Sequence, residues 1–265
     1  MEDWYEVPAE SGVKACLLIV HGAGEHYRRH QAVANYFAKA GFYVGMGDLP
    51  GHGRAKGMHG HIDDFQTYLD AVASWAQKLK QQFPDVPRFI LGHSMGGLIT
   101  ARFIQQQDAD NWNGVLLSSP CLGIALPIPG WKKRIANILE KWWPTLRLKS
   151  GIDKDALCRD PQVVDEYQKD PLVVKKVSVK WFCELQRAIS RAHEEVDRFQ
   201  VPVLITQGGA DRVVDPRATR RWYNQLEVED KQLIWVADGY HELLQEFVKY
   251  DLMEKMLAWT ENRLT

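Results

Sequence analysis

Short, unbroken apolar runs recur along this chain, and each stops at a small or polar residue. They occupy residues 15–20, 42–46, 88–91, 115–117, 202–206 and 232–236. Because Val, Ile and Leu are frequent in them and polar residues do not alternate with them, the runs are typical of parallel strands buried on both faces. We expect Trp4–Val7 to form an antiparallel edge strand, paired through a turn at residues 9–12.

The segments between these runs have the length and spacing of helices. In one of them, apolar residues recur at three- and four-residue steps, at Tyr68, Val72, Trp75 and Leu79. This spacing places them on a single buried helix face. Further helix candidates are residues 95–107, 217–226 and 243–263. The alternation of strands and helices predicts right-handed crossovers, and therefore an α/β fold with a mostly parallel, doubly wound sheet.

The alternation breaks between residues 121 and 199. That stretch has no strong strand signal, contains several prolines and includes amphipathic pieces. We interpret it as a helical cap inserted over the C-terminal edge of the sheet. The predicted division is therefore an α/β core of residues 1–120 and 200–265 and a cap of residues 121–199.

The composition excludes several classes of protein. Lys and Arg total 33 against 34 Asp and Glu, so the chain lacks the basic excess of a nucleic-acid-binding protein. No apolar run approaches the roughly 18 residues that suggest a membrane-spanning helix. The 4 cysteines are far apart, and the first residues lack the features of a signal peptide. We therefore expect a cytoplasmic protein without a disulfide framework.

A Gly-x-Ser-x-Gly pentapeptide at residues 92–96 follows a predicted strand and opens a predicted helix. This tight turn needs small neighbours, which Gly92 and Gly96 supply. It would hold Ser94 in a strained, exposed position as a nucleophile, with the Met95 N–H directed at an oxyanion. The alternative is that Ser94 only caps a helix N-terminus.

A serine nucleophile needs a base and a carboxylate that orients the base. His241 follows the last predicted strand and precedes the last helix, where a doubly wound hydrolase supplies its base. Asp211, after the strand at residues 202–206, is the preferred carboxylate. Asp215 looks like a helix cap before a proline, and Asp238 is too close in sequence to His241 to approach from a separate strand end.

The glycine-containing segment at residues 21–26 follows the first central strand. Its glycines let the backbone approach a reacting group, and we expect the Ala23 N–H to be the second oxyanion donor. His21 and His26 could instead bind a metal, but a third ligand has no obvious source.

A second metal hypothesis concerns residues 59–64, which are similar to the HxHxDH signature of binuclear zinc hydrolases. The segment ends in Asp64 rather than His. Asp63 or Asp64 more simply caps the following helix. We therefore expect neither a metal ion nor another cofactor.

Together these motifs resemble the α/β-hydrolases of the monoacylglycerol lipase and lysophospholipase group, also labelled serine aminopeptidase-like. The matching segments are residues 21–26, 48–53, 60–65, 92–97, 119–120, 170–172, 207–211 and 240–242. The resemblance implies a triad of Ser94, Asp211 and His241, in that order along the chain. It also implies oxyanion donors at Ala23 and Met95, and a cap tyrosine, Tyr167, near the substrate's head group.

The expected activity is cofactor-free hydrolysis of lipid-like carboxylic esters, such as monoacylglycerols or lysophospholipids, through an acyl-enzyme. Two other functions stay open at this point. A peptidase or amidase of the same fold would cleave aminoacyl amides. A non-catalytic binding protein of the same fold would not react with a fluorophosphonate.

One part of the predicted cap has an unusual surface pattern. Trp131, Ile135, Ile138, Leu139 and Trp142 share a helix face, and residues 131–151 contain six Lys or Arg against a single acidic residue, Glu140. Lys132 and Lys133 are two of the six basic residues. The apolar face could seal against the rest of the domain, or it could be a lid that rests in a membrane interface or lines an acyl tunnel.

Overall fold

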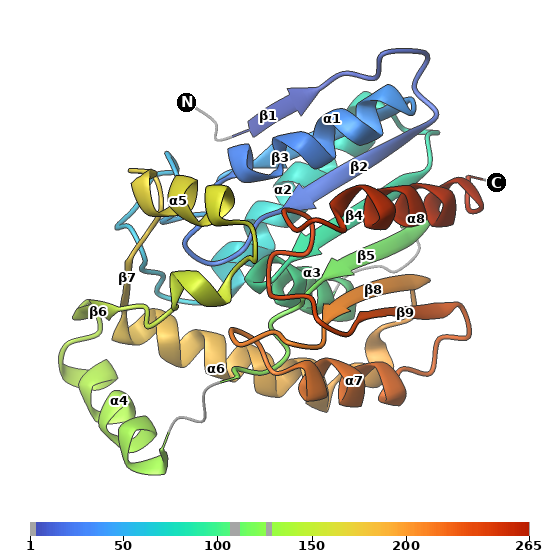
Figure 1. Ribbon diagram of the computed structural model, residues 1–265. Coiled ribbons are helices and arrows are strands. Elements are labelled where there is room, and N and C mark those ends of the chain that lie inside the picture. Colours follow the sequence, from blue (N-terminus) through green and yellow to red (C-terminus); the bar gives the residue numbers. More distant parts are fainter. Residues whose placement is uncertain (1–3, 107–111, 126–128, 265) are drawn as a thin grey trace.

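The computed structural model describes residues 4–106, 112–125 and 129–264, with only the backbone described at Lys132 and Lys133. A seven-stranded sheet runs through the molecule in the order β1-β3-β2-β4-β5-β8-β9 (Figure 1). Its strands are β1 (Trp4–Val7), β2 (Ala15–Val20), β3 (Phe42–Gly47), β4 (Arg88–His93), β5 (Gly114–Ser118), β8 (Val203–Gly208) and β9 (Lys231–Val236). All neighbours are parallel except β1, so the predicted doubly wound α/β architecture is confirmed.

Strand β1 is the predicted antiparallel edge strand, but its partner differs from the expected one. It pairs with β3, with Trp4 opposite Gly47, and not with the next strand in sequence. Strand β2 has no free edge because β3 and β4 flank it. Gly45 on β3 accommodates the indole of Trp4, since a Cβ at this position would lie 2.2 Å from that ring.

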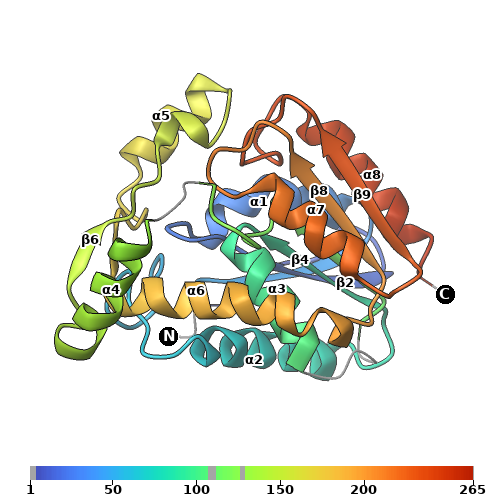
Figure 2. The ribbon, with the colours of Figure 1, turned by 90° about the horizontal axis from the view of Figure 1, so that it is seen from below.

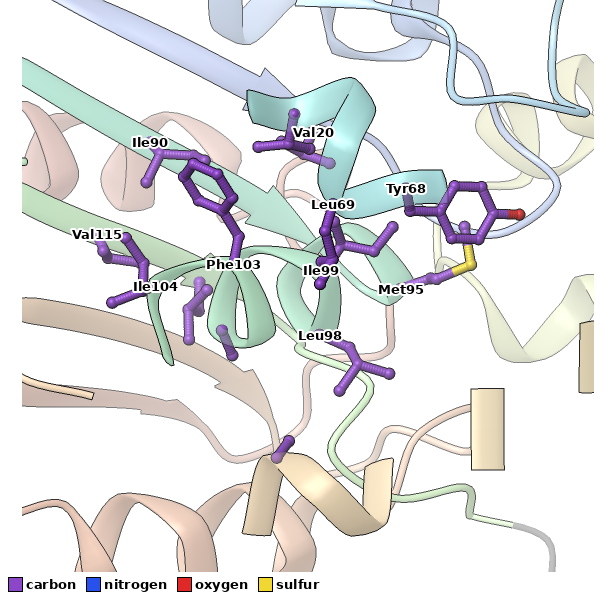
Figure 3. Close-up of a cluster of buried hydrophobic side chains, with 14 of the residues drawn as sticks. Val20, Tyr68, Leu69, Ile90, Met95, Leu98, Ile99, Phe103, Ile104 and Val115 are labelled. Atoms are coloured by element: carbon purple, nitrogen blue, oxygen red, sulfur yellow. The ribbon is translucent and has the colours of Figure 1, made fainter. Parts of the chain in front are cut away.

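Helices cover both faces of the sheet (Figure 2). On one face lie α2 (Gln66–Gln82), α3 (Met95–Gln106), α6 (Val179–Glu194) and α7 (Pro216–Gln225). On the other lie α1 (Gln31–Lys39) and α8 (Lys249–Glu261). Figure 3 shows the centre of the first layer, where Ile99 and Phe103 of α3 pack with Leu69 of α2 and Ile90 of β4. This packing fixes α3, and therefore Ser94 at its start, against the sheet.

Helix α8 begins later than the sequence pattern suggested. Leu243 and Leu244 are buried and extend the apolar periodicity, but they lie in a non-helical stretch that precedes Lys249. His241 lies in the same non-helical stretch, between β9 and α8. The sequence pattern therefore predicted the burial of Leu243 and Leu244 correctly, but it was wrong in predicting that they are helical.

The first part of the segment between β5 and β8 lies at the edge where the parallel strands end, and its last helix, α6, continues over one face of the sheet (Figure 1). The segment contains α4 (Gly130–Trp142), β6 (Arg147–Lys149), α5 (Pro161–Lys169), β7 (Lys176–Ser178) and α6. Strands β6 and β7 form an antiparallel ribbon that the helical interpretation missed, because three residues are too few for a strand pattern. Helix α6 packs on α3, where the Gln105 side chain donates to the Ala192 carbonyl at 2.8 Å. Within the described residues, no helix has the length and apolar character needed to span a membrane.

Candidate active site

Ser94 lies at the sharp turn between β4 and α3, with a positive φ of 52°. The turn closes because its flanking residues lack side chains. A Cβ on Gly92 would lie 2.5 Å from the Gly96 carbonyl oxygen, and a Cβ on Gly96 would lie 2.1 Å from the Val20 carbonyl oxygen. The strained backbone of Ser94 is therefore held by close packing between strand and helix.

The structure brings Ser94, His241 and Asp211 together from three separate loops. The Ser94 hydroxyl donates to Nε2 of His241 at 2.8 Å, and Nδ1 of His241 donates to Oδ2 of Asp211 at 2.8 Å. All three residues are buried. This is the geometry in which a histidine can accept the proton of an attacking serine.

Asp211 is held more firmly than its two rivals. Its Oδ1 accepts the backbone N–H groups of Val213 and Val214, at 2.8 and 3.0 Å. Asp215 instead caps α7 by accepting the N–H of Arg217, and Asp238 is exposed and paired with an arginine.

Burial and charge act in opposite directions on His241. Burial lowers its pKa, but the Asp211 carboxylate, together with Glu242 and Glu25, raises it by more, so the pKa of His241 lies above the ordinary 6.5. The neighbouring His93 differs, because burial lowers its pKa to about 3. Of these two imidazoles, His241 is the one hydrogen-bonded to the Ser94 hydroxyl.

Ala23 and Met95 both line the cavity into which Ser94 opens. The loop that carries Ala23 is fixed from behind, since the Gly22 N–H donates to Glu25 at 3.0 Å. Met95 is the first residue of α3, so its N–H belongs to the positive end of the helix dipole. Ala23 and Met95 therefore border the same space as Ser94, and their role as oxyanion donors stays a prediction.

The cavity at Ser94 has a volume of about 230 Å³ and mostly apolar walls. Val177, Trp181, Phe182 and Leu185 line it on the side of β7 and α6, and Ile152, Val174, Val213 and Val214 line it elsewhere. Its polar lining residues include Ser150, Asp153 and Arg212. Such a cavity suits an acyl chain with a polar group at one end.

The role of Tyr167 near the substrate's head group stays a prediction. The residue is buried in a small cluster with Leu157 and Val173, and the described lining of the cavity does not include it. Its hydroxyl lies 3.7 Å from where a Cβ on Gly24 would be, behind the loop that carries Ala23. The Arg29 guanidinium lies 5.0 Å from the centre of its ring.

The sequence analysis missed a buried charge network next to the site. Glu25 contacts His30 at 2.9 Å and His93 at 3.5 Å, and Arg29 pairs with Glu242 at 2.6 Å. Burial raises the pKa of Glu25, but His93, His30 and Arg29 lower it by more, which keeps the carboxylate ionised. The sequence signal that could have indicated this network is the position of Glu25 directly after Gly24 and of Glu242 directly after His241.

The two metal hypotheses do not correspond to ligand clusters. His61 contacts the Ser178 hydroxyl at 2.8 Å and Asp63 at 3.3 Å, and Asp64 accepts the N–H of Gln66 at 2.8 Å near the start of α2. His21 accepts the N–H of Leu49 through Nε2 at 2.9 Å. The described residues contain no group of three or more His, Cys, Asp or Glu side chains placed to hold a metal ion.

Comparison with known proteins identifies the family. Residues 11–247 match the family model described as serine aminopeptidase, S33. The chain belongs to this S33 family. Its relatives include phospholipase YtpA of Bacillus subtilis (strain 168), 35% identical over 248 residues that cover 93% of this chain and 95% of that protein. The monoglyceride lipase of Mus musculus is 30% identical over 256 residues, which cover 95% of this chain and 84% of the relative.

Solved structures lead to the same family-level result. The crystal structure of Paleococcus ferrophilus monoacylglycerol lipase superposes with a TM-score of 0.88 at 30% identity, covering 97% of each chain. The α/β-hydrolase fold and the resemblance seen in the sequence motifs are thus confirmed for this S33 member.

Proposed function

We propose that this S33 member is a serine hydrolase of lipid-like carboxylic esters, with monoacylglycerols or lysophospholipids as substrates. The observation that carries the proposal is the position of Ser94, hydrogen-bonded to His241 at the wall of a largely apolar cavity. An acyl chain would lose its contact with water there without leaving polar groups unpaired. The relatives named monoglyceride lipase and phospholipase support the same substrate class.

In the proposed mechanism, Ser94 attacks the ester carbonyl while His241 accepts its proton. Asp211 holds the imidazole in the required tautomer and stabilises the imidazolium. The N–H groups of Ala23 and Met95 bind the oxyanion of the tetrahedral intermediate. His241 then protonates the departing alcohol, which leaves the acyl group on Ser94.

Deacylation repeats these steps with water. His241 removes a proton from a water molecule, which attacks the acyl carbonyl, and Ser94 leaves as the restored hydroxyl with the proton that His241 returns. The proposed chemistry needs no cofactor. Tyr167 is proposed to support the head-group side of the site from behind Gly24 rather than by lining the cavity.

We also propose that residues 121–199 form a cap on a core of residues 1–120 and 200–265, and that α4 rests on membrane lipid. Apolar side chains on α4 are exposed, among them Trp131, Ile138 and Trp142. The location that we propose for the protein is the cytoplasm, where it would bind the membrane peripherally. The four free cysteines Cys16, Cys121, Cys158 and Cys183 suit a reducing compartment.

The test is a substrate panel measured with the purified protein. We expect hydrolysis of monoacylglycerols and lysophospholipids, reaction of Ser94 with a fluorophosphonate, and negligible cleavage of chromogenic aminoacyl amides. Faster cleavage of the amides would identify a peptidase or amidase. Absence of fluorophosphonate labelling would identify a binding protein without catalysis.

A further inference from the structure

The cavity at Ser94 is separated from a second hollow by two side chains. An outer groove of about 740 Å³ runs between the segment after β5, helix α6 and the start of α7, with Asn137 of α4 at its edge. Ile124 and Phe182 are the residues that the described linings of the groove and the cavity have in common. Both side chains are half-buried, as expected for a wall with a space on either side.

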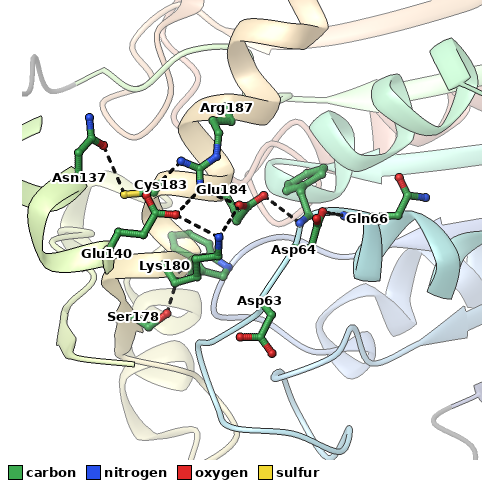
Figure 4. A network of polar contacts seen from close by, with 12 residues as sticks. Asp63, Asp64, Gln66, Asn137, Glu140, Ser178, Lys180, Cys183, Glu184 and Arg187 are labelled. Carbon is green, nitrogen blue, oxygen red and sulfur yellow. Dashed lines mark hydrogen bonds and ion pairs between the residues drawn. The ribbon is translucent and has the colours of Figure 1, made fainter. Parts of the chain in front are cut away.

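Hydrogen bonds hold the backbone on either side of this wall in place. The thickness of the wall therefore depends on the side chains of Ile124 and Phe182. Ile124 is bridged to Val214, and the Ala125 N–H donates to the Val213 carbonyl at 3.1 Å. Next to Phe182, the indole N–H of Trp181 donates to the Tyr68 hydroxyl at 3.0 Å. Figure 4 shows the neighbouring part of α6, where Cys183 and Arg187 contact Asn137 and Glu140 of α4.

The volume of the cavity limits the acyl chain that it can enclose. At about 230 Å³ the cavity is much smaller than the outer groove of about 740 Å³, so it encloses a short acyl chain more easily than a long one. A longer chain must leave the cavity. Ile124 and Phe182 line both the cavity and the outer groove, so a chain that passes between these two side chains enters that groove.

We propose that Ile124 and Phe182 determine acyl-chain length in this enzyme. Short chains are enclosed in the inner cavity, and long chains are accepted when they pass between these two side chains into the outer groove. Apolar Leu122 and Ile189 line that groove together with charged residues such as Arg187 and Asp215. This inference rests on the proposed lipid-ester activity and assigns a specificity role to residues outside the triad and the oxyanion loop.

The test compares variants that open the wall with one that only enlarges the cavity. Phe182→Ala removes a wall residue, and Phe182→Trp thickens the wall. Leu185→Ala is the matched comparator, because Leu185 lies three residues further along α6 and lines the cavity but not the groove. Each variant is compared by its kcat/KM for octanoyl glycerol, palmitoyl glycerol and a glycerol ester whose acyl chain ends in a pyrene, with circular dichroism to check folding.

We expect Phe182→Ala to raise the palmitoyl-to-octanoyl ratio of kcat/KM about tenfold, the low end of what a change of one methylene in an apolar pocket produces. Phe182→Trp should lower that ratio. The pyrene ester should be cleaved by Phe182→Ala and not by Leu185→Ala. An unchanged ratio in Phe182→Ala, or equal cleavage of the pyrene ester by both alanine variants, would overturn the proposal.

Failure of the proposed function would look different. In that case the wild-type protein cleaves none of the glycerol esters, although Ser94 reacts with a fluorophosphonate. The wall is then tested by labelling rates with butyl and hexadecyl fluorophosphonates, for which Phe182→Ala should raise only the hexadecyl rate. Equal effects on both probes would reject the wall in that case as well.

Discussion

The triad region and helix α4 place their polar and apolar groups in opposite ways. Around Ser94, polar side chains are buried and engaged with one another, and the side chain of His241 is only 3% exposed between its two partners. On α4, Trp131 is 61% exposed and Trp142 is 75% exposed, whereas the carboxylate of Glu140 faces α6. Figure 4 shows that Glu140 binds Lys180 and Arg187, which also contact Glu184.

This difference indicates how firmly each region is held. Breaking the buried hydrogen bonds of the triad would leave unpaired polar groups, so the native geometry is strongly preferred. The contacts between α4 and α6 include the ion pairs of Glu140 with Lys180 and Arg187, and Arg187 is 41% exposed, so water and salt weaken these contacts. We therefore expect a rigid triad and a helix that responds to its surroundings.

The largest expected effect comes from removing the nucleophile. Ser94→Ala should lower kcat for a short soluble ester by up to about 10⁶-fold, as in other serine hydrolases with this arrangement. Its thermal unfolding should stay close to wild type, because the substitution removes a hydroxyl and leaves the backbone turn in place. Retention of a tenth of the wild-type activity in the purified variant would refute the assignment of Ser94.

The second prediction separates Asp211 from its rivals. Asp211→Asn should lower kcat by about 10⁴-fold, because the amide would favour the wrong tautomer of His241. Asp215→Asn and Asp238→Asn are matched controls, since one caps α7 and the other lies at the surface. Steady-state kinetics on the same ester should rank Asp211→Asn far below both controls. If Asp238→Asn had the lowest kcat, the proposal that Asp211 orients His241 would be wrong.

The third prediction concerns pH. His241 must be neutral to accept a proton, so activity falls as the pH drops through its pKa, which lies above the ordinary 6.5. Because the Glu25 carboxylate helps to raise that pKa, Glu25→Gln should move the acid limb of kcat/KM to lower pH. Glu261→Gln, an exposed change on α8, should leave the profile unchanged. A shift of the Glu25→Gln profile to higher pH would contradict this account of the charges.

The strands and the loops that bring Ser94, Asp211 and His241 together could be predicted because their signals are local. Each apolar run ends at the sheet edge where Ser94, Asp211 and His241 lie, and the glycines beside Ser94 are needed by the turn itself. The outward orientation of α4 could not be predicted, since an amphipathic pattern gives the two faces of a helix and not which one meets the protein. The network around Glu25 was also missed, because its partners come from separate loops and pair only in the fold.

The fourth prediction tests the attachment of α4. Hydrogen bonds from Arg187 lower the pKa of Glu140 to about 2, so this carboxylate stays charged at ordinary pH. We therefore expect high salt, and not mild acid, to loosen the contact between α4 and α6. Glu140→Gln should destabilise the protein by about 1 kcal/mol or less. Hydrogen exchange of the α4 amides should increase more than that of α3, and high salt should produce the same pattern in the wild type. Unchanged exchange in α4 under both conditions would show that apolar contacts hold the helix.

The smallest expected effect concerns lipid binding by α4. Exposed Trp and Ile side chains would contribute roughly 25 cal/mol per Å² of apolar area buried in the interface. Each basic residue would contribute about 1 kcal/mol to the free energy of binding to an anionic surface. Salt screens this electrostatic contribution. Arg134→Glu with Lys141→Glu should therefore abolish the preference for anionic over neutral vesicles in co-sedimentation.

The matched control is the same charge reversal at Lys39 and Lys255, on α1 and α8, which should preserve the preference for anionic vesicles. Both pairs should leave short-ester hydrolysis nearly unchanged, because none of the four residues lines the cavity. Equal sedimentation of the wild type with both vesicle types at low salt would mean that the exposed face of α4 does not bind anionic lipid.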